Sequence, residues 1–271
     1  MNFKHQFKKV WMSIELFGIK EGEGTYIHEA YESLPPIEIP EQNLDWLNLT
    51  EFEVGVNEEE SYVLEKEERQ KFKELWVNIQ QQVDWLNIPE FEVGISDEEE
   101  NYALEKEERQ EFQERWLNIQ QQARDLQLTF PDYFLELIES FYLQDSIPSG
   151  TGCYFDLPDR ISESPFQTGD YILRFYNDSQ CCICWYLYFR QSGEVEVIAS
   201  SGTEYSPFLE DADASSIEFA KEYTYWVSPS FLEFLYRWWL ENHIWFKLRE
   251  QMTLSSQELA YIRYYQPSYP Q

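Results

Sequence analysis

The C-x-x-C spacing of Cys181 and Cys184, within "CCIC", is the first pattern in this sequence with known chemistry. Such thiols act in redox exchange at a helix N-terminus, but the flanking residues "YNDSQCCICWYLYFRQSGEV" are β-branched and aromatic and predict a strand. Residues i and i+3 of a strand point to opposite faces, so these two sulfurs cannot easily meet. A zinc site needs four converging ligands, whereas His5, His28 and His243 are scattered along the chain. We therefore expect buried cysteines and no metal site.

Carboxylates are the second group that could do chemistry, since the chain contains 51 acidic residues. A pair of them could act as a glycosidase acid and base, but nothing in the sequence singles out one pair. The runs Glu58–Glu60 and Asp97–Glu100 lack the alternating spacing and the turn glycine of a calcium loop, and we interpret them as solvated acidic turns. The sequence has no phosphate-binding or hydrolase motif, and His243 is interpreted as a structural histidine. We expect no catalytic residues, no cofactor and no enzymatic activity.

The charge balance predicts which partners the protein can bind. A net charge of −31 repels nucleic acids and anionic lipids and speeds encounter with basic proteins. No stretch approaches the ~20 apolar residues of a spanning helix. Glu15 interrupts the apolar part of the N-terminal segment, which also lacks a small-residue cleavage site. We expect a cytoplasmic protein that binds neither nucleic acid nor membrane.

An acidic, tryptophan-bearing block occurs twice in the first half of the chain. Residues 45–57 and 61–82 align with residues 84–96 and 101–122, with 25 identities in 35 positions. Each copy predicts a helix of roughly 25 residues, because its apolar residues fall at helical spacing. The two stripes are Leu64, Phe72, Trp76, Ile79, Val83 and Leu86 in the first copy, and Leu104, Phe112, Trp116, Ile119, Ala123 and Leu126 in the second. From residue 41 to residue 124, 23 acidic and 8 basic residues give a net charge of −15.

The rest of the chain changes from helix to strand and back to helix. Pro35, Pro36 and Pro40 favour an extended tether in residues 1–43. Pro131 and Asp132 predict a helix start, and strand-like runs follow at a spacing too short for crossover helices, which predicts an antiparallel sheet. Those runs are "CYFDL", "DYILRFY", "CICWYLYFR" and "EVEVIAS", and capping boxes then open two closing helices at Ser230–Glu233 and Ser255–Glu258. We predict an α+β fold with an N-terminal segment (1–43), an extra acidic helical unit (44–97) and a main domain (98–271).

Three stretches of the second half carry a family resemblance. They are the helix entry with Leu128, Pro131, Asp132, Tyr133, Leu135 and Leu137, the strands "DYILRFYNDSQCCICWYLYF", and the closing "SPSFLEFLYRWWLENHIWFKL". Together they resemble the SUKH superfamily of SMI/KNR-type proteins, and in particular a subgroup associated with cyanobacteria, over about residues 98–271. The chain departs from the family where "NG" commonly follows the entry helix, because it has "SFYLQDSIPSGTGCYF" there.

The resemblance implies a SUKH-like antiparallel sheet flanked by helices and a protein-binding function without shared catalytic residues. Bacterial members are immunity proteins against toxins, so a basic toxin is the expected partner. The alternative is a scaffold or adaptor that assembles, or self-associates, through the duplicated long amphipathic helix. The expected contact residues lie in the two acidic runs and on one face of the strand "CICWYLYFR". They are Glu58, Glu59, Glu60, Glu98, Glu99, Glu100, Tyr186 and Tyr188. The other face of that strand is expected to be core.

Overall fold

The computed structural model describes residues 7–14, 25–31, 34–39, 44–49, 97–179, 183–201 and 222–265. The chain divides into two compact units, one of residues 1–49 and 109–271, and one of residues 50–108. The described part of the first unit is an α+β domain, which confirms the predicted fold class. No helix among the described residues combines the length and the apolar character needed to cross a membrane.

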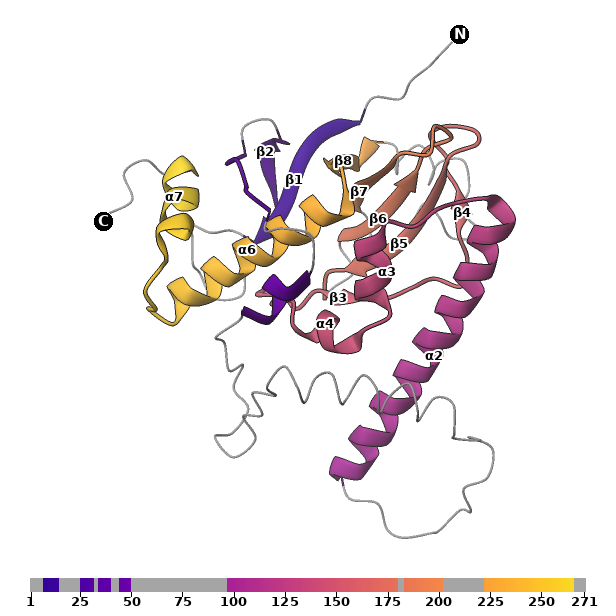
Figure 1. Ribbon diagram of the computed structural model, residues 1–271, viewed down its shortest axis with the longest axis horizontal. Coiled ribbons are helices and arrows are strands. Elements are labelled where there is room, and N and C mark those ends of the chain that lie inside the picture. The colour runs from indigo at the N-terminus through magenta and orange to yellow at the C-terminus, as the bar shows by residue number, and fades with distance from the viewer. Residues whose placement is uncertain are drawn as a thin grey trace. The chain divides into compact units, whose positions relative to one another are not determined.

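One mixed sheet of eight strands forms the centre of the domain (Figure 1). The strands are β1 (Lys8–Ile14), β2 (Thr25–Ala30), β3 (Tyr154–Phe155), β4 (Ser162–Glu163), β5 (Tyr171–Asn177), β6 (Ile183–Phe189), β7 (Val195–Ser201) and β8 (Thr224–Ser228). Their order is β2-β1-β8-β7-β6-β5-β3, and β4 also pairs with β5. The pairs from β3 to β8 are antiparallel, and between β5 and β6 and between β6 and β7 the connections have only five residues, too few for a parallel crossover.

The helices follow the sequence signals closely. They are α2 (Asp97–Leu126), α3 (Asp132–Ile138), α4 (Phe141–Asp145), α6 (Phe231–Arg249) and α7 (Ser256–Tyr265), together with a 3-10 helix at Leu44–Leu49. The predicted capping box is complete at Ser255 and Glu258, which bond each other's backbone N–H groups. At the start of α6 the serine half is present, because the Ser230 hydroxyl accepts a hydrogen bond from the Glu233 backbone N–H, while the Glu233 carboxylate accepts one from Tyr31. Each bond from a backbone N–H satisfies a donor that a helix start would otherwise leave unpaired.

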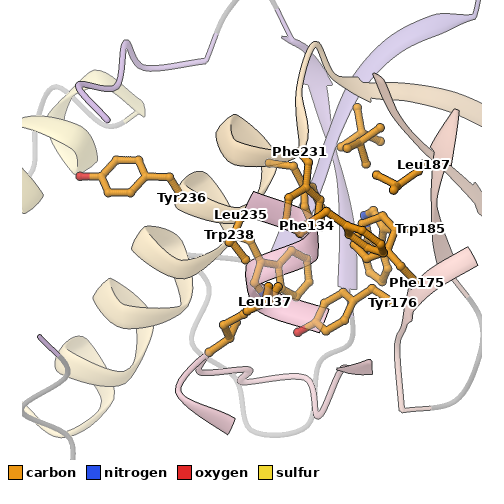
Figure 2. Close-up of a cluster of buried hydrophobic side chains, with 14 of the residues drawn as sticks. Phe134, Leu137, Phe175, Tyr176, Trp185, Leu187, Phe231, Leu235, Tyr236 and Trp238 are labelled. Carbon is orange, nitrogen blue, oxygen red and sulfur yellow. The ribbon is translucent and has the colours of Figure 1, made fainter. Parts of the chain in front are cut away.

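Helices α3 and α6 pack against one face of the sheet and enclose an aromatic core (Figure 2). The ring of Phe134 in α3 lies 5.1 Å from that of Phe231 in α6 and 5.9 Å from that of Phe175 in β5. Trp185 of β6 and Trp238 of α6 meet edge to face at 5.0 Å. These geometries are the ones that aromatic pairs prefer, so the sheet and both helices are fixed by the same interlocked rings.

The N-terminal segment differs from the predicted tether and domain division. Residues 8–14 and 25–30 form strands of the sheet, and Leu34 is buried in the core. The predicted antiparallel sheet is also corrected here, because β1 pairs with β8 in parallel through Lys8 and Lys9. The physical reason is that β1 reaches β8 from more than 200 residues away in sequence, so no short turn dictates the direction of pairing.

The described residues of the two repeat copies are different parts of the repeat. The first copy supplies the 3-10 helix, in which Leu44, Trp46 and Leu47 are buried. The second copy supplies α2, which is 30 residues long rather than roughly 25. Its predicted stripe is confirmed where side chains are described: Phe112, Trp116, Ile119 and Ala123 are buried, and Leu126 packs against the core. The first-copy stripe lies outside the described residues.

Candidate interaction surfaces

The two faces of β6 agree with the sequence pattern, but the expected tyrosine surface does not form. Ile183, Trp185, Leu187 and Phe189 point into the main core, as predicted. Tyr186 and Tyr188 point to the other face, where their exposed fractions are only 2% and 1%. They belong there to a second apolar cluster that includes Phe7, Ile172, Ile198 and Trp226. The sequence pattern did not predict this second cluster, because Phe7 enters it next to β1, a strand that the pattern did not indicate.

Tyr188 is held in that cluster by hydrogen bonds. Its hydroxyl donates to Asp170 Oδ2 at 2.6 Å and lies 3.4 Å from the Ser164 hydroxyl. Asp170 is itself buried and accepts a second bond from the Gln191 backbone N–H at 2.8 Å. Burial, followed by the bond to the Asp170 carboxylate, raises the pKa of Tyr188 above its ordinary value. The hydroxyl of Tyr188 is therefore fixed inside the fold by its bond to Asp170.

Helix α2 separates a core face from a polar face. The copy-to-copy differences fall largely on the polar face, as predicted: Glu111 and Gln113 are exposed, and the half-buried Arg115 pairs with Asp156 at 3.2 Å. Leu117 is 64% exposed on this helix, and the equivalent position of the first copy is the apolar Val77. An isolated exposed leucine is ordinary on a protein surface and is no site by itself.

The acidic candidates divide between described and undescribed residues. Glu98, Glu99 and Glu100 lie in the first turn of α2, where carboxylates interact favourably with the positive end of the helix dipole. Glu58, Glu59 and Glu60 lie outside the described residues. From residue 50 to residue 108, 19 acidic and 5 basic residues give a net charge of −14. This compact unit thus contains nearly half of the total charge of the chain.

The indole of Trp46 occupies a well-defined site on α6. Its ring meets Tyr236 at 5.0 Å and Trp239 at 5.2 Å, both edge to face, and 3% of the residue is exposed. Tyr236 and Trp239 stack on each other at 5.9 Å, and Gln257 of α7 donates a hydrogen bond to the Tyr236 hydroxyl. The sequence analysis assigned this tryptophan to a separate unit. The signal that could have revealed it is the "DWLN" retained unchanged in both copies.

A buried polar network joins α6 to β1 and α7 and was also missed. Glu241 Oε2 accepts a hydrogen bond from the Trp11 indole at 2.7 Å, and its Oε1 accepts one from the Tyr261 hydroxyl at 2.5 Å. Arg237 donates to the Pro35 carbonyl and to Tyr261. Buried charged groups are stable only when they are paired in this way, so the network fixes the relative positions of these elements.

His243 is a structural residue, as predicted. It is 5% exposed, its ring stacks on Trp239 at 4.9 Å, and its Nε2 lies 3.2 Å from Glu258 Oε1. Of the cysteines with described side chains, Cys184 is buried and Cys153 half-buried. Within the described ranges, no three His, Cys, Asp or Glu side chains are grouped to hold a metal ion.

Three candidates for interaction therefore remain, each considered by itself: the acidic residues of the unit 50–108, the exposed face of α2, and the α6 site that holds Trp46. No family model, curated protein or solved structure matches the chain.

Proposed function

We propose that the protein is a non-enzymatic protein-binding domain of the immunity type, which binds and masks a basic protein such as a toxin. The observation that carries the proposal is the uneven distribution of charge: residues 50–108 hold −14 of the total of −31 in a compact unit of their own. Burial of Tyr186 and Tyr188 directs the proposal away from the sheet and toward this acidic unit.

Charge of this kind acts mainly on the rate of encounter. An acidic surface raises the association rate with a basic partner by ~10-fold or more at low salt, and added salt screens the effect. Exposed ion pairs contribute only ~0–1 kcal/mol each. The dissociation rate should therefore depend little on the acidic residues and more on buried contacts.

The test uses a six-Gln variant of Glu58, Glu59, Glu60, Glu98, Glu99 and Glu100. A pull-down with the wild-type chain identifies the partner, which is then purified for kinetic measurements across a salt series. The variant should lose most of the low-salt association rate and of the salt dependence, while its dissociation rate stays within about twofold.

A matched control separates local charge from total charge. It carries the same charge change at six exposed acidic residues of other elements: Glu136, Asp159, Glu163, Glu194, Glu222 and Glu250. The control should keep most of the wild-type association rate. If both variants lose the association rate equally, the acidic unit acts only through the net charge of the chain. If the association rate of the six-Gln variant is unchanged, the proposed surface is refuted.

A second candidate function is a scaffold that assembles through the duplicated helices. It is favoured by the duplication itself, because residues 61–82 repeat the sequence of residues 101–122 of α2, including its buried Phe and Trp positions. An amphipathic helix requires a partner for its apolar stripe. Light scattering across a hundredfold range of concentration tests this alternative, since a scaffold of this kind would grow in mass and the immunity-type protein alone would not.

A further inference from the structure

The site that holds Trp46 consists of the Tyr236 and Trp239 rings of α6. Figure 2 shows Tyr236 pointing away from the aromatic core that α6 forms with the sheet. Trp46 fills this site edge to face against both rings, while the neighbouring Leu44 and Leu47 are 1% and 0% exposed. Three apolar side chains of one short segment are therefore buried in the domain, and the indole of Trp46 is the one that contacts both rings.

The same three-residue pattern occurs again 39 residues later. Residues 83–88, "VDWLNI", repeat residues 44–49, "LDWLNL", and align Trp85 with Trp46 and Leu86 with Leu47. At the buried positions the single change is Val83 for Leu44, which removes one methylene group. Residues 83–88 lie outside the described residues, so the comparison is one of sequence alone.

We propose that residues 83–88 are a second occupant of the Trp46 site in the same chain and exchange with residues 44–49. This inference is independent of the proposed function. The methylene lost at Val83 favours the Trp46 arrangement by a factor of about 2–10.

Helix α2 has no such substitute. It continues into α3 through residues 127–131, where the Leu128 backbone N–H donates to the Ala123 carbonyl at 2.8 Å and Gln127 adopts a φ of 58°. The first copy continues after its "NIQQQ" into "VDWLN" instead, so it lacks this connection. The exchange is therefore confined to the "DWLN" segments. The equivalent tryptophans of the two repeat helices, Trp76 and Trp116, should not exchange and provide the control.

The test is a double-mutant cycle of Trp46→Ala and Trp85→Ala in the full chain, read by urea unfolding at pH 7. Trp85→Ala should change the folding equilibrium constant less than twofold in the wild-type background. In the Trp46→Ala background it should lower that constant at least tenfold, because the substitute is then removed as well. Equal effects of Trp85→Ala in the two backgrounds would overturn the proposal.

Two further measurements keep the result unambiguous. The chain lacking residues 44–82 has only the second segment, so it should fold, and Trp85→Ala should lower its folding constant at least 100-fold. Failure of this shortened chain to fold would also overturn the proposal. In the control cycle, Trp76→Ala should have less than a twofold effect with or without Trp116→Ala. The unfolding midpoint of Trp46→Ala should not change with protein concentration, since a dependence would mean that another chain supplies the tryptophan.

Discussion

Replacement of Glu258 by Gln tests how α7 is held against α6. The carboxylate is 4% exposed, and Lys247 Nζ donates to its Oε1 at 3.0 Å and to its Oε2 at 3.3 Å. His243 Nε2 lies 3.2 Å from Oε1, and the Ser255 backbone N–H donates to Oε2 at 2.6 Å. Burial raises the pKa of Glu258, but the hydrogen bonds from His243, Ser255 and Lys247 outweigh it and lower the pKa from 4.5 to about 2.

This shift has a defined effect on stability. Because the folded-state pKa lies below the unfolded value, the carboxylate stabilises the fold fully above about pH 4.5, and the contribution is lost as the pH falls toward 2. At ~1.4 kcal/mol per pKa unit the upper limit is ~3.4 kcal/mol. Helix α7 lies near the end of the described chain and Lys247 is partly solvated, so we expect about 2 kcal/mol after solvent screening.

Urea unfolding at pH 7 and at pH 3 measures both parts of the prediction. Glu258→Gln should lower the free energy of unfolding by about 2 kcal/mol at pH 7, and the gap to the wild type should fall to less than half of that at pH 3. Glu250→Gln is the control, since its exposed carboxylate at the end of α6 should contribute within ~0.5 kcal/mol. A gap that stays constant between the two pH values would mean that Glu258 acts through shape and packing, and the charge argument would be wrong.

Two other substitutions and one deletion test the remaining contacts. Trp116→Ala should lower the free energy of unfolding by ~3–5 kcal/mol, because the buried indole packs on Phe130 and Phe134; a loss below ~1 kcal/mol would place α2 outside the cooperative core. Trp11→Phe should cost ~1.5–3 kcal/mol in the same assay, since it removes the hydrogen bond to the Glu241 carboxylate at 2.7 Å; an unchanged midpoint would contradict the network. Deletion of residues 44–82 should leave a folded domain by circular dichroism, because residues 83–88 can replace the buried Leu44, Trp46 and Leu47. Loss of the near-ultraviolet signal in that chain would mean that the first copy is required.

Local signals explain which parts of the fold could be predicted. The period-2 pattern of "CICWYLYFR" gives both faces of β6, and the spacing of Phe112, Trp116, Ile119 and Ala123 gives the core face of α2. Ser230 and Ser255 mark helix starts because their side chains satisfy backbone donors locally. In each case the signal, whether a residue spacing or a cap hydrogen bond, is contained within one element of the chain.

The parts that could not be predicted depend on partners that are distant in sequence. Strand β1 pairs with β8 over only two residues, Lys8 and Lys9, and no local pattern specifies that partner. Tyr186 and Tyr188 follow the polar-face alternation, yet Phe7 and Trp226 cover them. A tyrosine satisfies an exposed and a buried position equally well when a buried acceptor such as Asp170 is available, so the sequence alone could not decide between them.

The junctions of the repeat explain how the chain accommodates a duplication of 39 residues. In a single-copy chain, the segment between the "DWLN" motif and α2 would have the eight residues equivalent to 89–96, whereas residues 50–96 now separate them. For a fully flexible chain, extending a connection from 8 to 47 residues would cost only ~1.6 kcal/mol of closure entropy. An interruption inside α2 or α6 would instead remove a buried aromatic contact, at ~3–5 kcal/mol for one ring. Both junctions lie outside α2 and α6, so the duplication leaves the buried aromatic contacts of these two helices intact.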